Sequence, residues 1–142
     1  MNAPAHTSEL LTLRAARFAQ SPALRDERST LTFAQLEHSA AAAAAALASY
    51  GVQAGDRVLL VVDNCAEAIV LFFALGRLDA WAVLAGNRLA PAEVDAIVAH
   101  CEPRLVIYAG ERAFEAHGRR RGQSRSTSIL SVRCGSSTVR PA

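Results

Sequence analysis

Lysine is absent from this sequence, since all fifteen basic residues in its 142 positions are arginine. The chain therefore cannot form a Schiff base through its own side chains, and it cannot build a GxxxxGK[ST] phosphate loop. It also lacks the lysine of the ion pair that kinases use. Any phosphate group bound by this chain must be held by arginine or by backbone amides.

Cysteine is scarce as well, with only Cys65, Cys101 and Cys134. Their odd number and the absence of a Cys-x-x-Cys spacing favour reduced thiols over a disulfide framework. Cys65 precedes a predicted helix and could be an activated thiolate, but no histidine follows at an interpretable position, so we expect a packed small residue. His100, Cys101 and Glu102 are neighbours on a predicted helix and point in different directions. We therefore predict no metal site.

Long apolar runs are missing too. The segment Met1–Leu10 has neither the basic nor the apolar region of a signal peptide. The most apolar stretch, Ala68–Leu75, is flanked by Glu67, Arg77 and Asp79. We expect no membrane span and a cytoplasmic protein.

The composition suits one folded domain, with 51% apolar and 20% charged residues. The net charge of +2 hides an uneven distribution. Residues 1–117 carry nine arginines and thirteen acidic residues, a formal charge of −4, whereas residues 118–142 carry six arginines and no acid. The second part has one isolated apolar pair, Ile129-Leu130, and is otherwise rich in Arg, Ser and Gly. We predict an N-terminal α/β subdomain over residues 1–117 and a disordered tail over residues 118–142.

Two motifs in the tail have functional alternatives. The segment Gly135–Thr138 resembles part of a phosphate loop, but no strand is predicted before it and no lysine follows. The run Arg119–Arg121 could bind nucleic acid non-specifically. Because no aromatic residue is interleaved to stack on bases, we expect a solvated tail and no specific nucleic-acid partner.

The first fifty residues predict a helix, a hairpin and a second helix. The first helix spans Glu9–Ala19 with Ser8 as its N-cap. Short strands follow at Ala23–Arg25 and Ser29–Thr32, joined by a charged turn. Thr32 and Gln35 then form a capping-box pattern, Gly51 marks the end of the second helix, and seven consecutive alanines at residues 40–46 permit close packing.

The next sixty residues alternate strands and helices. A continuous apolar run after Arg57 predicts a strand at residues 57–62 that is covered on both faces. Asn64 and Glu67 repeat the capping pattern and begin an apolar helix, which we interpret as a buried crossover. Further elements are predicted as a strand at residues 81–84, a helix from Pro91 to Cys101, and a strand at residues 105–108. The order predicts the α/β class, with a parallel βαβαβ sheet, packed helices and a small N-terminal hairpin.

These segments also resemble a known family. The pieces LTFAQLE, GVQAGDRV, NCAEAIVLFFA, NRLAPAE and PRLVIY follow one another at close spacing within residues 8–110. In this order they resemble the N-terminal portion of the AMP-forming acyl-CoA synthetases, in the adenylate-forming ligase superfamily (the AMP-dependent synthetase and ligase family). The sequence departs from the family at Asp63, where proline is usual, at Asp79 and Trp81, and at Ala90, where Ser or Thr is common.

The resemblance implies a partial subdomain of a larger enzyme. Members activate a carboxylic acid with ATP and magnesium to an acyl-adenylate and then transfer the acyl group to coenzyme A. Their phosphate loop, their magnesium-binding aromatic-Thr-Glu segment, their ribose-binding Asp and their C-terminal lysine have no counterpart here. We therefore expect a truncated fragment that is inactive alone, with no catalytic, cofactor-binding or metal-binding residues, whose partner is the missing remainder of the enzyme.

Two questions stay open on the sequence. Asp63-Asn64 and Asn87-Arg88 follow predicted strands, where open α/β sheets bind ligands, although Asn64 is more simply a cap and Arg88 a solvated loop residue. The alternative function is a free-standing α/β module that binds a small ligand or dimerises through a sheet edge.

The arginine-rich tail also suggests a hypothesis about the reading frame. In GC-rich DNA, a run of CGC arginine codons read one frame over becomes GCC alanine codons, so a frame change near Gly118 would turn an alanine-rich continuation into this tail. Translating the same DNA in the other frames tests it.

Overall fold

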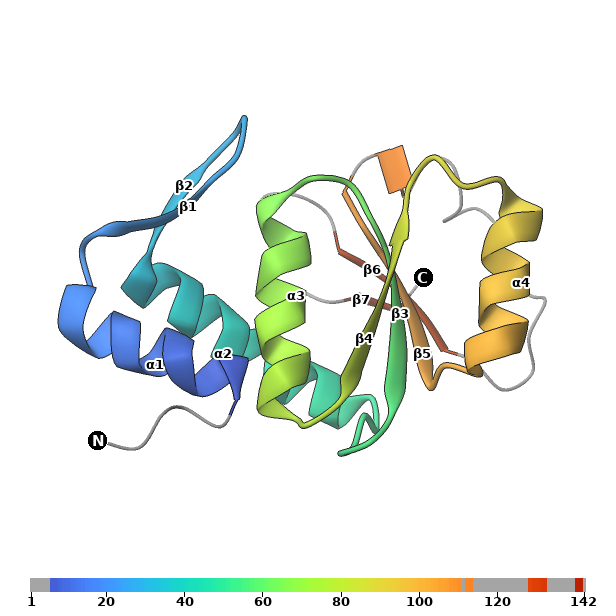
Figure 1. The fold of residues 1–142 in the computed structure, drawn as a ribbon, viewed down its shortest axis with the longest axis horizontal. Coiled ribbons are helices and arrows are strands. Elements are labelled where there is room, and N and C mark those ends of the chain that lie inside the picture. Colours follow the sequence, from blue (N-terminus) through green and yellow to red (C-terminus); the bar gives the residue numbers. More distant parts are fainter. Residues whose placement is uncertain (1–5, 111, 114–127, 133–139, 142) are drawn as a thin grey trace.

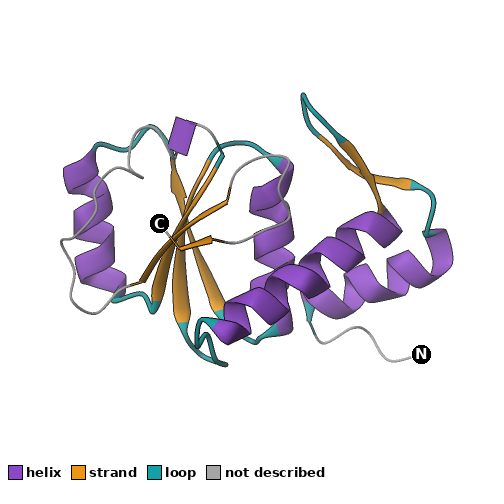
Figure 2. Cartoon of the chain, turned by 180° about the vertical axis from the view of Figure 1, so that it is seen from behind, coloured by secondary structure: helices purple, strands orange, loops and turns teal. Residues whose placement is uncertain are grey.

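The fold is a small helical and hairpin unit beside a parallel sheet (Figures 1 and 2). A computed structural model describes residues 6–110, 112–113, 128–132 and 140–141. The elements, in chain order, are α1 (Thr7–Phe18), β1 (Pro22–Arg25), β2 (Thr30–Thr32), α2 (Phe33–Ser49), β3 (Arg57–Val62), α3 (Ala66–Arg77), β4 (Trp81–Gly86), α4 (Pro91–Cys101), β5 (Leu105–Ala109), β6 (Ser128–Val132) and β7 (Arg140–Pro141).

The main sheet has the strand order β4-β3-β5-β6-β7 among the described residues, with β3 parallel to both neighbours. Leu60 on β3 lies opposite Leu84 on β4 and Ile107 on β5. Four of the six β3 residues and all of β5 are buried, as a strand covered on both faces requires. The predicted α/β class and parallel βαβαβ unit are confirmed.

Helices cover both faces of this sheet (Figure 1). On one face, α2 and α3 pack through a cluster that includes Leu47, Leu71 and Leu75. On the other face, α4 packs through Val94. The helix α3 connects β3 to β4 across one face of the sheet, and α4 connects β4 to β5 across the other face. The strands β4 and β5 therefore lie on opposite sides of β3, and the topological switch point lies between β3 and β5.

The helix α2 begins as its sequence predicts. The Thr32 hydroxyl accepts from the Gln35 backbone N–H (3.3 Å), and the Gln35 side chain accepts from the Thr32 N–H (2.9 Å). Ala40 is fully buried against Leu11 and Leu36, which confirms that the alanine run serves close helix packing. Across the same bundle, Glu37 Oε1 accepts from Thr12 of α1 (3.1 Å) and from Arg77 of α3 (2.8 Å).

Several local predictions are wrong. Ser8 is not the cap of α1, which begins after His6, and its hydroxyl donates instead to the Gly76 carbonyl of α3 (3.3 Å). Asn64 is not the cap of α3, whose N-cap position is Cys65. The helix α3 is also not buried all round, because Ile69 and Phe72 are each 39% exposed.

Two strands fall within the segment predicted to be a disordered tail. The strand β6 pairs in parallel with β5, with Ile129 opposite Val106, and β7 pairs antiparallel with β6. Most of residues 118–142 lie outside the described residues, so the division of the chain at residue 117 and the disorder of the tail stay predictions. The arginine run at residues 119–121 and the Gly135–Thr138 motif lie outside the described residues.

No helix in the described part of the chain is long and apolar enough to cross a membrane. Cys65 and Cys101 are both free thiols, and Cys134 lies outside the described residues.

Candidate functional site

The carboxyl edge of the parallel sheet is organised around Asp63, the residue that follows β3. Its Oδ1 accepts from the Asn87 side-chain amide (2.5 Å) and from the backbone N–H of Ala113 (3.1 Å). Its Oδ2 accepts from the backbone N–H of Arg112 (3.0 Å). One carboxylate therefore joins the ends of β3, β4 and β5.

Gly110 permits this arrangement. Its φ is +100°, a backbone conformation that side chains rarely adopt. A Cβ at this position would lie 2.6 Å from both Cβ and Cγ of Asp63. The chain can therefore turn over Asp63 after β5 only because residue 110 has no side chain.

The switch point between β3 and β5 is where an open α/β sheet ordinarily binds a ligand. Here the Asp63 carboxylate is engaged within the chain, because it accepts hydrogen bonds from Asn87, Arg112 and Ala113. The sequence-based expectation that Arg88 is a solvated loop residue agrees with its exposed position. We interpret Asp63 and Asn87 as positioning residues of the fold.

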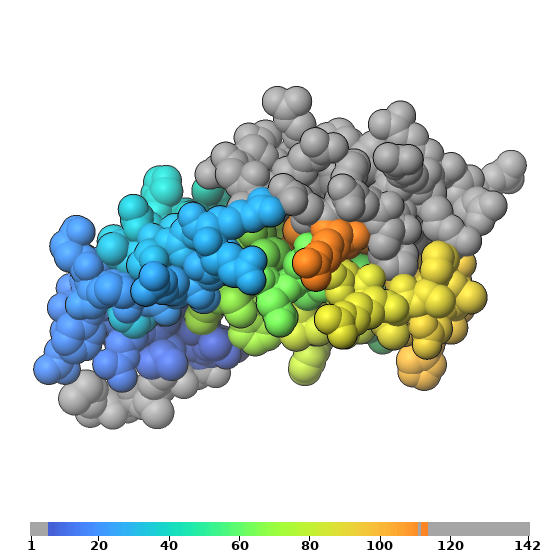
Figure 3. Space-filling model, turned by 90° about the horizontal axis from the view of Figure 1, so that it is seen from above, coloured from blue at the N-terminus to red at the C-terminus, as the bar shows by residue number. Residues whose placement is uncertain are grey.

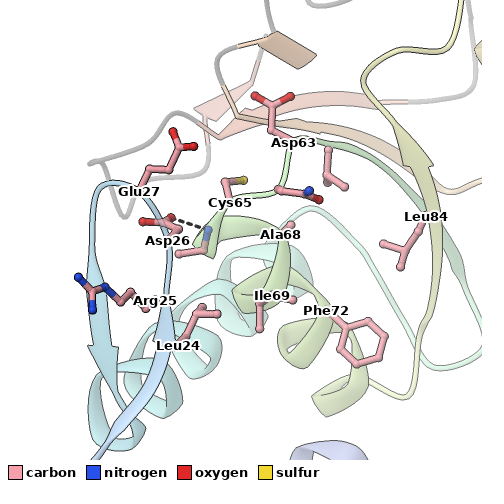
Figure 4. A pocket seen from close by; sticks show the side chains of 13 residues that line it. Leu24, Arg25, Asp26, Glu27, Asp63, Cys65, Ala68, Ile69, Phe72 and Leu84 are labelled. Carbon is pink, nitrogen blue, oxygen red and sulfur yellow. Dashed lines mark hydrogen bonds between the residues drawn. The ribbon is translucent and has the colours of Figure 1, made fainter.

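A second carboxylate, Asp26, fastens the hairpin to α3. Within the turn its Oδ1 accepts from the backbone N–H of Arg28 (2.9 Å) and of Ser29 (2.7 Å). Its Oδ2 accepts from the N–H of Ala66 (2.9 Å), the first residue of α3 (Figure 4). Asp26 thus supplies from forty residues away the cap that Asn64 was predicted to supply, and its negative charge lies at the positive end of the helix.

A cleft of about 650 Å³ runs across the exposed face of α3, between the hairpin and β4 (Figure 4). Leu24, Ile69, Phe72 and Leu84 form much of its apolar lining. From the carboxyl edge, the hairpin is seen beside the start of α3, with residues 112–113 close by (Figure 3). The hairpin and α3 both contribute residues to this cleft.

The rim of this cleft is acidic. Asp26, Glu27 and Asp63 carry three negative charges, against the single positive charge of Arg25. An anion such as a carboxylate or a phosphate is repelled by this rim, whereas a cation is attracted. The charge therefore disfavours the cleft as a site for an acid or a nucleotide.

The thiol of Cys65 also lines the cleft. Burial raises its pKa to about 12, and the nearby negative charges of Glu67 and Asp63 add to the effect. A thiol with such a pKa stays protonated at neutral pH and is a poor nucleophile. The structure thus agrees with the interpretation of Cys65 as a packed small residue.

No group of three or more His, Cys, Asp or Glu residues that could hold a metal ion occurs in the ranges described above. Cys101 is buried while His100 and Glu102 are exposed, so these three neighbours do not converge on one point. The acidic rim of the cleft does not fit the phosphates of ATP or coenzyme A, and Asp63 already accepts hydrogen bonds from Asn87, Arg112 and Ala113.

The pH dependence of stability gives a test of the Asp26 contacts. Hydrogen bonds from the backbone N–H groups of Arg28, Ala66 and Ser29 lower the Asp26 pKa from 3.8 to about 2. Because the folded pKa is depressed, the stabilisation is fully present above pH 4 and is lost as the pH falls towards 2. We expect D26N to be less stable than the native chain above pH 4, with a difference that shrinks between pH 4 and pH 2.

Urea unfolding at several pH values measures this difference. The matched control is E27Q, which removes the neighbouring negative charge at the exposed tip of the hairpin and leaves the Asp26 hydrogen bonds in place. A D26N deficit that stays constant from pH 6 to pH 2 would contradict the assignment.

Comparison with known proteins gives the family. The family described as AMP-binding enzyme matches residues 11–138. A long-chain-fatty-acid–CoA ligase, FadD13 of Mycobacterium tuberculosis, is 36% identical over 83 residues, which are 58% of this chain and 16% of the relative. A fatty acid–[acyl-carrier-protein] ligase, MmaC of Mycobacterium marinum, is 32% identical over 108 residues, or 75% of this chain and 20% of the relative.

Solved structures agree with these relatives. An anthranilate CoA ligase, AuaEII, in complex with anthranoyl-AMP has a TM-score of 0.82 and 25% identity, covering 93% of this chain and 26% of that chain. A fatty acyl CoA synthetase of Mycobacterium tuberculosis has a TM-score of 0.77 and 26% identity, covering 90% of this chain and 26% of that chain. The chain thus spans about a quarter of these structures. With the family match extending over most of its length, this chain belongs to the AMP-binding enzyme family and corresponds to an N-terminal portion of an AMP-forming acyl-CoA synthetase.

Proposed function

We propose that this chain is the N-terminal structural subdomain of an acid–CoA ligase and that it does not catalyse acid activation by itself. In the complete reaction, a carboxylate oxygen attacks the α-phosphorus of ATP and pyrophosphate leaves. The thiol of coenzyme A then attacks the acyl carbon, and AMP leaves. The names of the relatives mention long-chain fatty acids, propionate and anthranilate, so the substrate class that they share is a carboxylic acid.

One observation carries the proposal of inactivity. At the switch point of the sheet, where a ligand would be expected, the Asp63 carboxylate is engaged by hydrogen bonds from Asn87, Arg112 and Ala113. The absence of lysine supports the same conclusion, because no lysine is available to neutralise the phosphates or the acyl-adenylate. The chain's contribution is then a rigid sheet against which the rest of the enzyme packs.

A chimera tests both halves of this proposal. Residues 11–110 would replace the equivalent segment of FadD13, and acid-dependent ATP–pyrophosphate exchange would be measured with a long-chain fatty acid. We expect no exchange from the 142-residue chain alone, and exchange by the chimera within roughly tenfold of FadD13. The matched control is the same chimera carrying G110A, which we expect to lose activity together with its fold.

Two results would contradict the proposal. Exchange catalysed by the isolated chain would show that its catalytic groups are complete. A chimera that has the circular dichroism and elution volume of FadD13 yet shows no exchange would show that this chain is not a ligase subdomain.

A further inference from the structure

The outer edge of β4 is an open sheet edge among the described residues, since β4 is the end strand of the sheet. Its sequence, WAVLAG, contains no charged residue and no proline, and it keeps an unbroken register with β3 over all six residues. Natural proteins ordinarily protect such edges with charges, proline, bulges or a covering element. The β4 edge has none of the first three.

The backbone of β4 shows which groups face outward. The N–H of Trp81 donates to Asp56 O (2.7 Å) and the N–H of Asn87 donates to Val62 O (3.2 Å), so the odd-numbered residues direct their polar groups towards β3. Because the direction alternates along a strand, Ala82, Leu84 and Gly86 direct their N–H and C=O groups outward. These residues form a row of donors and acceptors suited to another strand.

Large apolar side chains flank this edge on both faces of the sheet. Trp81 is 69% exposed and Leu84 is 60% exposed. Since they are separated by an odd number of positions, they lie on opposite faces. On the face of Leu84, the apolar surface continues to Ile69 and Phe72 of α3 across the cleft (Figure 4).

We propose that the occupant of this edge is a second copy of the chain, which pairs β4 with β4 in antiparallel orientation about a two-fold axis at Val83. This register places Ala82 opposite the partner's Leu84, so that the outward-directed residues form the hydrogen-bonded pairs. Val83 then meets the partner's Val83 in a non-hydrogen-bonded pair, where side chains lie closest. This inference does not rest on the proposed function.

Side-chain size favours this register. Leu84 faces the small Ala82 of the partner, and Trp81 faces the small Ala85, so each large exposed side chain lies opposite a small one on its own face of the sheet. Moving the axis to Leu84 would instead place Leu84 opposite Leu84 and Trp81 opposite Asn87. The register centred on Val83 therefore buries more apolar surface against complementary neighbours.

The charges at the two ends of β4 also favour antiparallel pairing. Asp79 precedes the strand and Arg88 follows it. Asp79 lies in the turn before the strand, 3.6 Å from His6, and antiparallel pairing about Val83 brings this turn to the same end as the partner's Arg88, with the contact repeated at the other end by symmetry. Because the same edge serves both copies, the assembly closes as a dimer and leaves no further β4 edge open.

Sedimentation equilibrium on the 142-residue chain tests the dimer. We expect a mass of about 30 kDa, twice 15.1 kDa, at high protein concentration, with dissociation on dilution. L84K places a charge on the edge and is expected to weaken association roughly tenfold or more. The matched control is L13K, because Leu13 of α1 is similarly exposed at 58% and lies away from β4.

A cysteine substitution tests the register without disturbing the fold. In a chain with the three native cysteines replaced by alanine, V83C is expected to form an intermolecular disulfide with oxidised glutathione, which accepts the two electrons released. A85C lies on the same face two residues away. It is expected to remain largely uncrosslinked, because in this register residue 85 lies opposite residue 81 of the second copy and far from residue 85 of that copy.

Three results would overturn the inference. They are a monomer throughout the concentration series, an association that L84K and L13K weaken equally, and crosslinking at residue 85 in preference to residue 83. Circular dichroism and thermal melts of each variant establish that it is folded before its mass is interpreted.

Discussion

Replacing Gly110 with alanine is expected to lower the free energy of unfolding by about 3 kcal/mol. The φ of +100° strains any residue with a side chain, and the new Cβ would meet Cβ and Cγ of Asp63 at 2.6 Å. Asp63 cannot withdraw without losing its bonds to Asn87, Arg112 and Ala113. The variant therefore either keeps the strain or releases the loops at the carboxyl edge. Urea unfolding monitored by circular dichroism measures the loss.

The matched control is Gly55, whose φ of +82° is similar but which has no atom within 4 Å of an added Cβ. G55A should show the backbone strain alone, about 1 kcal/mol. The difference between the two variants isolates the contact with Asp63. Equal losses for G110A and G55A would show that the packing of Gly110 against Asp63 is unimportant.

Much of the fold follows from sequence periodicity. The runs at residues 58–62 and 105–109 carry no charged residue because α2 and α3 cover one face of their strands and α4 the other. Such runs are strong signals for buried parallel strands. The capping box at Thr32 is equally local, since both of its hydrogen bonds join residues three apart. Features that depend on one segment are the ones that the sequence predicts well.

The candidate site was harder to predict because its contacts are long-range. Asp26 lies in a turn whose sequence, Asp-Glu-Arg-Ser, indicates an Asx-type turn, but nothing local indicates that its second oxygen caps α3. Asn64, which has the right residue type in the right place, is not the cap because Asp26 already occupies the Ala66 N–H. Asp63 is similar, since its partners are 24 to 50 residues away.

The strand β6 shows the same limit. A composition of Arg, Ser and Gly with one apolar pair predicts disorder when only local burial is considered. The strand β6 forms beside β5, whose opposite edge is already paired with β3. Partner strands in a parallel sheet can be distant in sequence, so composition within a window does not report them. The family match, which extends to residue 138, is consistent with this continuation of the sheet.

The second large effect is expected at Leu47, where L47A should lower the free energy of unfolding by about 3 kcal/mol. Leu47 is fully buried in the cluster that joins α2 to α3 and to the sheet. Removing its branched end leaves a cavity that the surrounding α3 and β3 side chains can fill only by moving inward from their present packing. Urea unfolding at a single protein concentration measures the loss, because self-association would otherwise add a concentration-dependent term.

The control L13A removes the same atoms from a helical leucine that is 58% exposed, and it should change stability by less than about 0.5 kcal/mol. Equal losses for L47A and L13A would show that α2 does not share a core with the sheet. That result would also count against the proposed ligase role, because a subdomain that supports the rest of an enzyme must itself hold its helices and sheet in one arrangement. A total stability of about 5–15 kcal/mol is ordinary for a domain, so a loss of about 3 kcal/mol from Leu47 alone is a large share of it.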